Sequence, residues 1–225
     1  MADWHVQQGP FDIPDVPDFI PRRLKPYLFI FFVLIIQFSG GVYLAAASDM
    51  VGTKTVMQED ILMAGYASLI GMAINFAMMF RIKFRFSTRN QLLVSGMVLI
   101  AANVICAYTA SVPLLVGTCF VAGWFRMQAT FACNSTIQLW LTPVRDMAIF
   151  FCYVYIIVDS VIQLSGIATI YTAFFSQWEY MHWIMTGMLA LMMLMVMILV
   201  KPVRGPMFIP LLGIDWIGAV LWAIF

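Results

Sequence analysis

Six long apolar stretches run through this chain, and they leave little room for any fold other than a bundle of membrane-spanning helices. Each is close to the roughly 20 residues that an α-helix needs to cross the hydrocarbon core of a bilayer. Charged residues make up only 10% of the 225, against about 25% in soluble domains. We therefore predict an all-α, polytopic membrane protein. The predicted spans cover residues 27–48, 61–80, 91–110, 113–138, 147–174 and 182–200.

The charged residues outside the spans divide into two groups. Cations gather before the first span, after the second, after the fourth and after the sixth, whereas the other three loops contain one cation, Lys54. Because cytoplasmic loops carry an excess of Lys and Arg, we predict a cytoplasmic N-terminus and an even number of complete spans. The cations of the predicted cytoplasmic side are Arg22, Arg23, Lys25, Arg81, Lys83, Arg85, Arg89, Arg145, Lys201 and Arg204.

The two ends of the chain differ from the six-span region at 27–200. Residues 1–26 contain five prolines and four aspartates without the pattern of a cleavable signal peptide, so we expect a cytoplasmic extension. Residues 201–212 are expected to form a cytoplasmic linker. Residues 213–225 are apolar after Asp215 but too few to cross a bilayer, and we expect them to begin an incomplete seventh span. The expectation is the N-terminal half of a larger protein.

Arg126 is the one cation that falls inside a predicted span, and it lies near the middle of the fourth. A charge at that depth costs at least ~3 kcal/mol, so it needs a polar partner or a water-filled cavity. Thr130, Asn134 and Gln138 follow at intervals of four residues, which places them on one helix face. Such a stripe is consistent with interhelical hydrogen bonds or with the wall of a hydrated cavity, and the arginine at its head favours the cavity.

A second deeply placed charge, Asp159, lies at a similar depth in the fifth span, and Gln163 follows one turn later. Three alternatives are open for Asp159: a structural ion pair with Arg126, a role in proton coupling, or no contact with Arg126. Gln37 in the first span and Asn75 in the second are further polar candidates, either for the same pathway or for helix packing.

Other chemistry finds little support in the sequence. The four cysteines lie in apolar segments without a CxxC spacing, and we interpret them as packing residues. His5 and His182 lie apart, with no cluster of carboxylates and histidines around them. We therefore expect no metal, no cofactor, no catalytic residue, no enzyme activity and no nucleic-acid partner.

Several features resemble the N-terminal half of a major facilitator superfamily transporter: the six spans, the basic loop 80–89 and the arginine of the fourth span. Arg126-Met-Gln128 is similar to that family's Arg-x-x-Gln-Gly motif, although the glutamine comes one residue early and the glycine is missing, so only Arg126 carries over. The sequence Gly213-Ile-Asp-Trp-Ile-Gly218, after a short linker, looks like the start of the seventh span in the fourteen-span drug:proton antiporter subfamily.

This resemblance implies a bundle of two inverted three-helix repeats with a substrate site at the membrane midplane. It implies a secondary active transporter of the bacterial inner membrane, exporting small apolar or amphipathic compounds in exchange for protons, as in multidrug efflux. Its partners would be the lipid bilayer, the small-molecule substrate, the coupling proton and the missing C-terminal half. A complete six-span channel, or a small homodimeric carrier, is the alternative.

Overall fold

The computed structural model describes most of the six-span region and little of the two ends. In the described residues every regular element is a helix, so the all-α prediction is confirmed. Most of the expected extension, linker and seventh span lies outside the described residues. Those that the structure describes are 16–17, 20–21, 24–38, 47, 50–51, 56–141, 147–201, 217–218 and 221.

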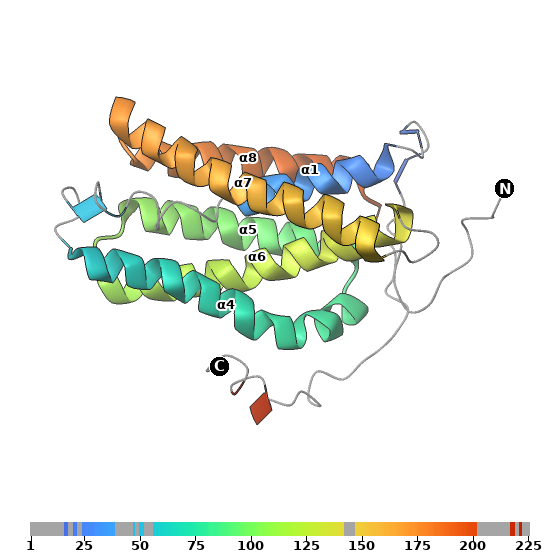
Figure 1. Ribbon diagram of the computed structural model, residues 1–225, viewed down its shortest axis with the longest axis horizontal. Coiled ribbons are helices and arrows are strands. Elements are labelled where there is room, and N and C mark those ends of the chain that lie inside the picture. The colour runs from blue at the N-terminus through green and yellow to red at the C-terminus, as the bar shows by residue number, and fades with distance from the viewer. Residues whose placement is uncertain are drawn as a thin grey trace.

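Six helices of the described region correspond to the six predicted spans. Four of them contain segments long and apolar enough to cross a membrane: α4, α5, α6 and α8. The described part of α1 has 14 residues, and α7 has 29. The helices, labelled as in Figure 1, are α1 (Lys25–Phe38), α4 (Gln58–Arg85), α5 (Thr88–Tyr108), α6 (Val112–Leu141), α7 (Met147–Phe175) and α8 (Glu179–Leu199).

Short described connections separate α4 from α5, α5 from α6 and α7 from α8, and local groups cap several helix starts. At the start of α4 the Asp60 carboxylate accepts a hydrogen bond from the backbone N–H of Met57, at 3.3 Å. Between α4 and α5, the Ser87 hydroxyl accepts from the backbone N–H of Asn90, a typical N-cap. Pro113 is the second residue of α6, where its missing N–H breaks no helical hydrogen bond. Such short connections force consecutive helices to run antiparallel.

The helices lie lengthwise in layers (Figure 1). α1, α7 and α8 form one side, α5 and α6 the middle, and α4 the opposite side. The most extensive contact joins α4 to α6, while α5 packs on both α6 and α8 and α1 packs on α6 and α7. The main core lies between α1, α5, α6 and α8, where Phe29 and Phe32 pack edge to face at 5.6 Å between ring centroids.

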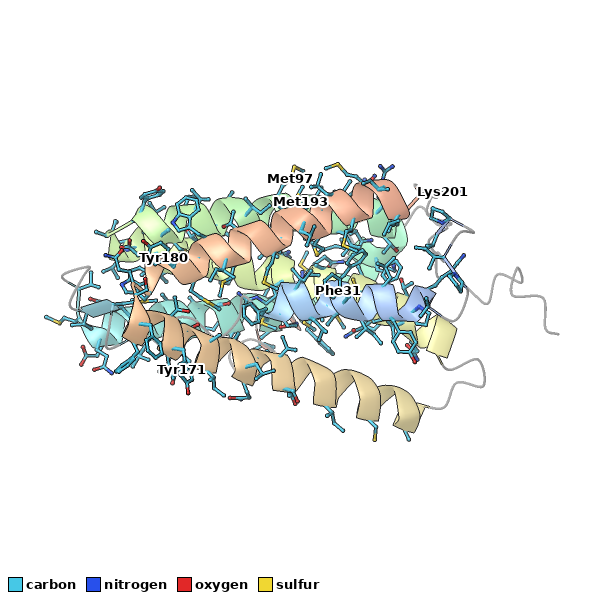
Figure 2. All side chains as sticks on the ribbon, turned by 90° about the horizontal axis from the view of Figure 1, so that it is seen from above. Phe31, Met97, Tyr171, Tyr180, Met193 and Lys201 are labelled. Carbon is cyan, nitrogen blue, oxygen red and sulfur yellow. The ribbon has the colours of Figure 1, made fainter. Side chains whose placement is uncertain are left out.

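Charge is divided between the two ends of this bundle. In Figure 2, Lys201 lies at one end and Tyr180, at the start of α8, lies near the other. The cations of α1, α4 and α5 share the end with Lys201, whereas the acidic residues at the starts of α4 and α8 share the opposite end. We call these the cationic end, with Lys25, Arg81, Lys83, Arg85, Arg89 and Lys201, and the acidic end, with Glu59, Asp60 and Glu179.

Candidate functional site

Two glycines, one on α4 and one on α6, make a very close contact between these helices. A Cβ atom added at Gly71 would lie 2.1 Å from the carbonyl oxygen of Phe120, and one added at Gly123 would lie 1.9 Å from that of Ser68. Neither distance is compatible with a real side chain. Small residues allow backbones to approach in this way in membrane bundles, so the glycines set how closely α4 and α6 approach.

Arg126 lies one turn beyond this contact and is held by α4. Its side chain is 6% exposed, and Nη1 donates a hydrogen bond to the hydroxyl of Ser68 at 3.3 Å. Because a guanidinium stays protonated in proteins, this is a permanent positive charge enclosed near the middle of α6. It can attract an anionic group or stabilise negative charge, but it cannot release a proton.

The predicted stripe on α6 is divided among several neighbours. Thr130 is buried and its hydroxyl accepts a hydrogen bond from Nε2 of Gln37 on α1, at 2.8 Å. This bond links two of the residues singled out in the sequence. Asn134 and Gln138 are half-buried, and Oδ1 of Asn134 is enclosed without a hydrogen bond in the structure. The oxygen Oε1 of Gln37 is likewise enclosed without a hydrogen bond in the structure.

Asn75 is fully buried on α4, and neither atom of its amide group has a hydrogen-bond partner among the described residues. It lies between Gly71 and Phe80, which both contact α6; the Phe80 ring meets Phe131 edge to face at 4.8 Å. An amide enclosed in this way usually binds a water molecule or another polar group, because burial without one costs free energy. The centre of the α4–α6 contact is therefore polar as well as close.

Asp159 and Gln163 are both exposed on α7. No hydrogen bond or ion pair between described residues joins the exposed Asp159 to the buried Arg126. The physical reason is the rotation of α7 about its axis: the helix buries Ser165 and Thr169 and turns the face that carries Asp159 away from the bundle.

Lys83 was expected in a basic loop, and this expectation was wrong. Helix α4 continues to Arg85 and therefore carries Lys83 inward, where its side chain is 3% exposed. The ammonium group donates hydrogen bonds to the hydroxyl of Thr88 and, at 3.4 Å, to the carbonyl oxygen of Ala132. These contacts tie the end of α4 to both α5 and α6.

Gln91 and Gln128 complete this second polar cluster, and the sequence did not single them out as a pair. The Nε2 group of Gln91 donates to the carbonyl oxygens of Ile82, Lys83 and Phe86 at the end of α4, where helices leave backbone carbonyls to be capped. Its Oε1 accepts from Nε2 of Gln128 at 2.9 Å. The available signal was Gln128 in the fourth-span motif and a Gln in the first turn of α5.

His182 is buried near the start of α8. It is 2% exposed, its ring lies 5.7 Å from that of Trp178, and Nδ1 lies 3.3 Å from Oδ1 of Asn103 on α5. This contact joins α5 to α8 near the acidic end. It contributes to the packing of these two helices.

The chemistry of this interior rests on fixed charge and hydrogen bonding. In the described region no group of three or more His, Cys, Asp or Glu side chains is arranged to hold a metal ion. No family model matches the chain, and no curated protein matches it. A functional assignment must therefore come from the residues and their positions.

Proposed function

We propose that this chain is the N-terminal half of a secondary active transporter that exports small apolar or amphipathic compounds across a bacterial inner membrane in exchange for protons. The observation that carries the proposal is Arg126, a permanent cation enclosed near the middle of a membrane-length helix and hydrogen-bonded to Ser68. Intramembrane charges are costly and mark substrate or ion pathways.

The pairing of helices supports an arrangement of two inverted repeats, α1–α4–α5 and α6–α7–α8, described along the chain. The corresponding helices of the two repeats are α1 and α6, α4 and α7, and α5 and α8. If each helix is exchanged with its counterpart, the α4–α6 contact becomes the α1–α7 contact, and the α5–α6 contact becomes the α1–α8 contact. It leaves the α1–α6 and α5–α8 contacts unchanged, and only the minor α7–α8 and α6–α7 contacts are without a comparable counterpart. Inverted repeats with a polar site at their interface are a common plan of secondary transporters.

The separation of charge supports an orientation. Outside the middle of the bundle, the described cations lie at one end and the described acids at the other. Since Lys and Arg are retained on the cytoplasmic side, we propose that the cationic end is cytoplasmic and the acidic end faces outward. The N-terminus then lies in the cytoplasm.

The exposed face of α7 supports a second wall to the site. A carboxylate and an amide at the middle of a membrane helix are expensive in contact with lipid. We propose that Asp159 and Gln163 face a water-filled pathway shared with the missing C-terminal half, and that Asp159 carries the coupling proton. Arg126 then orders charge inside this half, and Asp159 lies at its edge.

The test is proton-driven transport of a lipophilic cationic dye in inside-out vesicles. The vesicles would contain the chain together with any coding sequence that continues beyond Phe225. Replacing Arg126 with Ala should abolish dye accumulation while the protein remains in the membrane, and Arg126→Lys should recover part of it. The matched control is Lys201→Ala, which removes an exposed cation at the cationic end and should leave uptake unchanged. Unchanged uptake in Arg126→Ala would overturn the assignment.

A further inference from the structure

Two thiols from neighbouring helices meet near the acidic end of the bundle. Cys106 lies two residues before the end of α5, and Cys119 lies in the third turn of α6. Their sulfur atoms are 4.0 Å apart, and the side chains are 3% and 4% exposed. No short sequence motif links them, because the juxtaposition arises from the packing of α5 against α6.

The surroundings of this pair are small and apolar. The sulfurs lie in a cluster with Ala64 of α4, Leu115 and the partly buried Val116. A disulfide bond is about 2.05 Å long, so the sulfurs need to approach by roughly 2 Å, which rotation of two short side chains and a small helix shift can supply. The remaining cysteines are placed differently: Cys133 is fully buried toward the middle of the bundle, and Cys152 is exposed on α7.

We propose that Cys106 and Cys119 form a reversible disulfide that joins α5 to α6, a modification that goes beyond the transport function. Two thiols lose two protons and two electrons, one S–S bond forms, and dioxygen accepts the protons and electrons to become hydrogen peroxide. Dioxygen is apolar and enters the bilayer, so burial of the pair does not exclude it. A thiol reductant reverses the reaction by disulfide exchange.

Its setting in the cell depends on the proposed orientation. If the acidic end faces outward, the pair lies toward an oxidising compartment, where disulfides persist. The bond would hold α6, which carries Arg126, against α5 at that end. It would thus restrict movement of the helix that carries the buried charge, and it would constrain the unfolded chain.

The experiment counts thiols in the full chain, in membranes, with Cys152→Ser as the background so that exposed thiols cannot cross-link two molecules. After oxidation with copper phenanthroline in air, the protein is denatured and alkylated with a maleimide polymer that shifts its mobility once per thiol. We expect the number of alkylated thiols per chain to fall from three to one, and dithiothreitol to restore it to three. Adding Cys106→Ser or Cys119→Ser should abolish the loss, whereas adding the control Cys133→Ser should preserve a loss of two.

Three alkylated thiols after oxidation, or a loss that persists in Cys106→Ser, would overturn the proposal. Mass spectrometry of the unsubstituted chain keeps the test independent of any variant that fails to insert, since a cross-linked Cys106–Cys119 peptide is lighter by two hydrogen atoms. If the disulfide forms with added oxidant but both cysteines are fully reduced in cells, the result would support the pairing of the two sulfurs and contradict the outward orientation. The two proposals therefore fail separately.

Discussion

Polar side chains are enclosed at the α4–α6 contact, whereas on the outer face of α7 they are exposed. At the contact, Arg126 reaches Ser68 across a gap set by two glycines, and the side chains are enclosed. On α7, Asp159 and Gln163 lie at comparable depth but point out of the bundle (Figure 2, where α7 lies along one edge). The depth of a polar residue in a predicted span thus does not decide whether its hydrogen-bond partners lie inside the bundle or outside it.

The two regions are therefore expected to have different roles. The α4–α6 contact holds a charge in one position and forms part of the rigid interior. The α7 face depends on water, on a second bundle or on another copy for its polar groups. Substitutions at the contact should therefore change folding stability, whereas substitutions on α7 should change assembly or transport with little effect on stability.

The largest effect is expected for Gly123→Ala. The added Cβ would overlap the carbonyl oxygen of Ser68 at 1.9 Å, so α4 and α6 must separate. We expect a loss of about 3 kcal/mol in the free energy of unfolding, measured by denaturant titration in detergent followed by circular dichroism. The matched control is Gly117→Ala, where no atom lies within 4 Å of the new Cβ; it should be neutral or stabilising. Equal losses at both glycines would contradict the close-contact interpretation.

The next largest effect is expected for Gln91→Leu. This change removes hydrogen bonds to three carbonyl oxygens at the end of α4 and leaves Gln128 without its acceptor. Enclosed groups without partners cost about 1–3 kcal/mol each, and partial relaxation should bring the total to about 2 kcal/mol. The same titration measures it. The exposed neighbour Asn90, changed to Ala, should cost under about 0.5 kcal/mol, and a similar loss there would argue against the capping role.

A smaller effect is expected for the link between α1 and α6. Gln37→Leu and Thr130→Val each remove one partner of a 2.8 Å hydrogen bond. Each should cost about 1 kcal/mol, and the double variant should cost less than the sum because both partners are then apolar. A double-mutant cycle in the same titration measures this coupling. Strict additivity would show that the bond contributes nothing to stability.

The smallest effect on stability is expected for Asp159→Asn. Because the carboxylate is exposed and has no hydrogen bond to Arg126, the free energy of unfolding should change by under about 0.5 kcal/mol. Proton-driven dye uptake should nevertheless fall to background, if Asp159 carries the proton as proposed. A large loss of stability would place Asp159 inside the bundle and remove the contrast between the two regions. Ser160→Ala, at the exposed neighbour, is the control for both readouts.

Part of the candidate site was accessible from the sequence, and part was not. Arg126 and Gln37 stood out because a charge or an amide is rare in an apolar run, and the structure buries both. Ser68 and the cysteine pair gave no signal, since serine and cysteine are ordinary in membrane helices. The sequence around Lys83 was misleading, because several cations close together are typical of a loop outside the membrane.

The sequence by itself determined the number of helices in the described region and most of their bounds to within a few residues; the exceptions are the ends of α1 and α4, predicted at 48 and 80 but described at Phe38 and Arg85. Those features depend on local properties: the length of an apolar run, the position of prolines and the placement of charges between runs. It also predicted that the cations would gather on one side, because cytoplasmic loops carry an excess of Lys and Arg.

Only the tertiary structure decided which neighbour each polar residue meets. A helix can rotate about its axis without changing its bounds, and this rotation encloses Lys83 and exposes Asp159. The rotation is set by the packing of each helix against its neighbours, and for α4 and α6 the backbone contact at Gly71 and Gly123 constrains it. Residues far apart in the chain fix it together, so no window of sequence contains it.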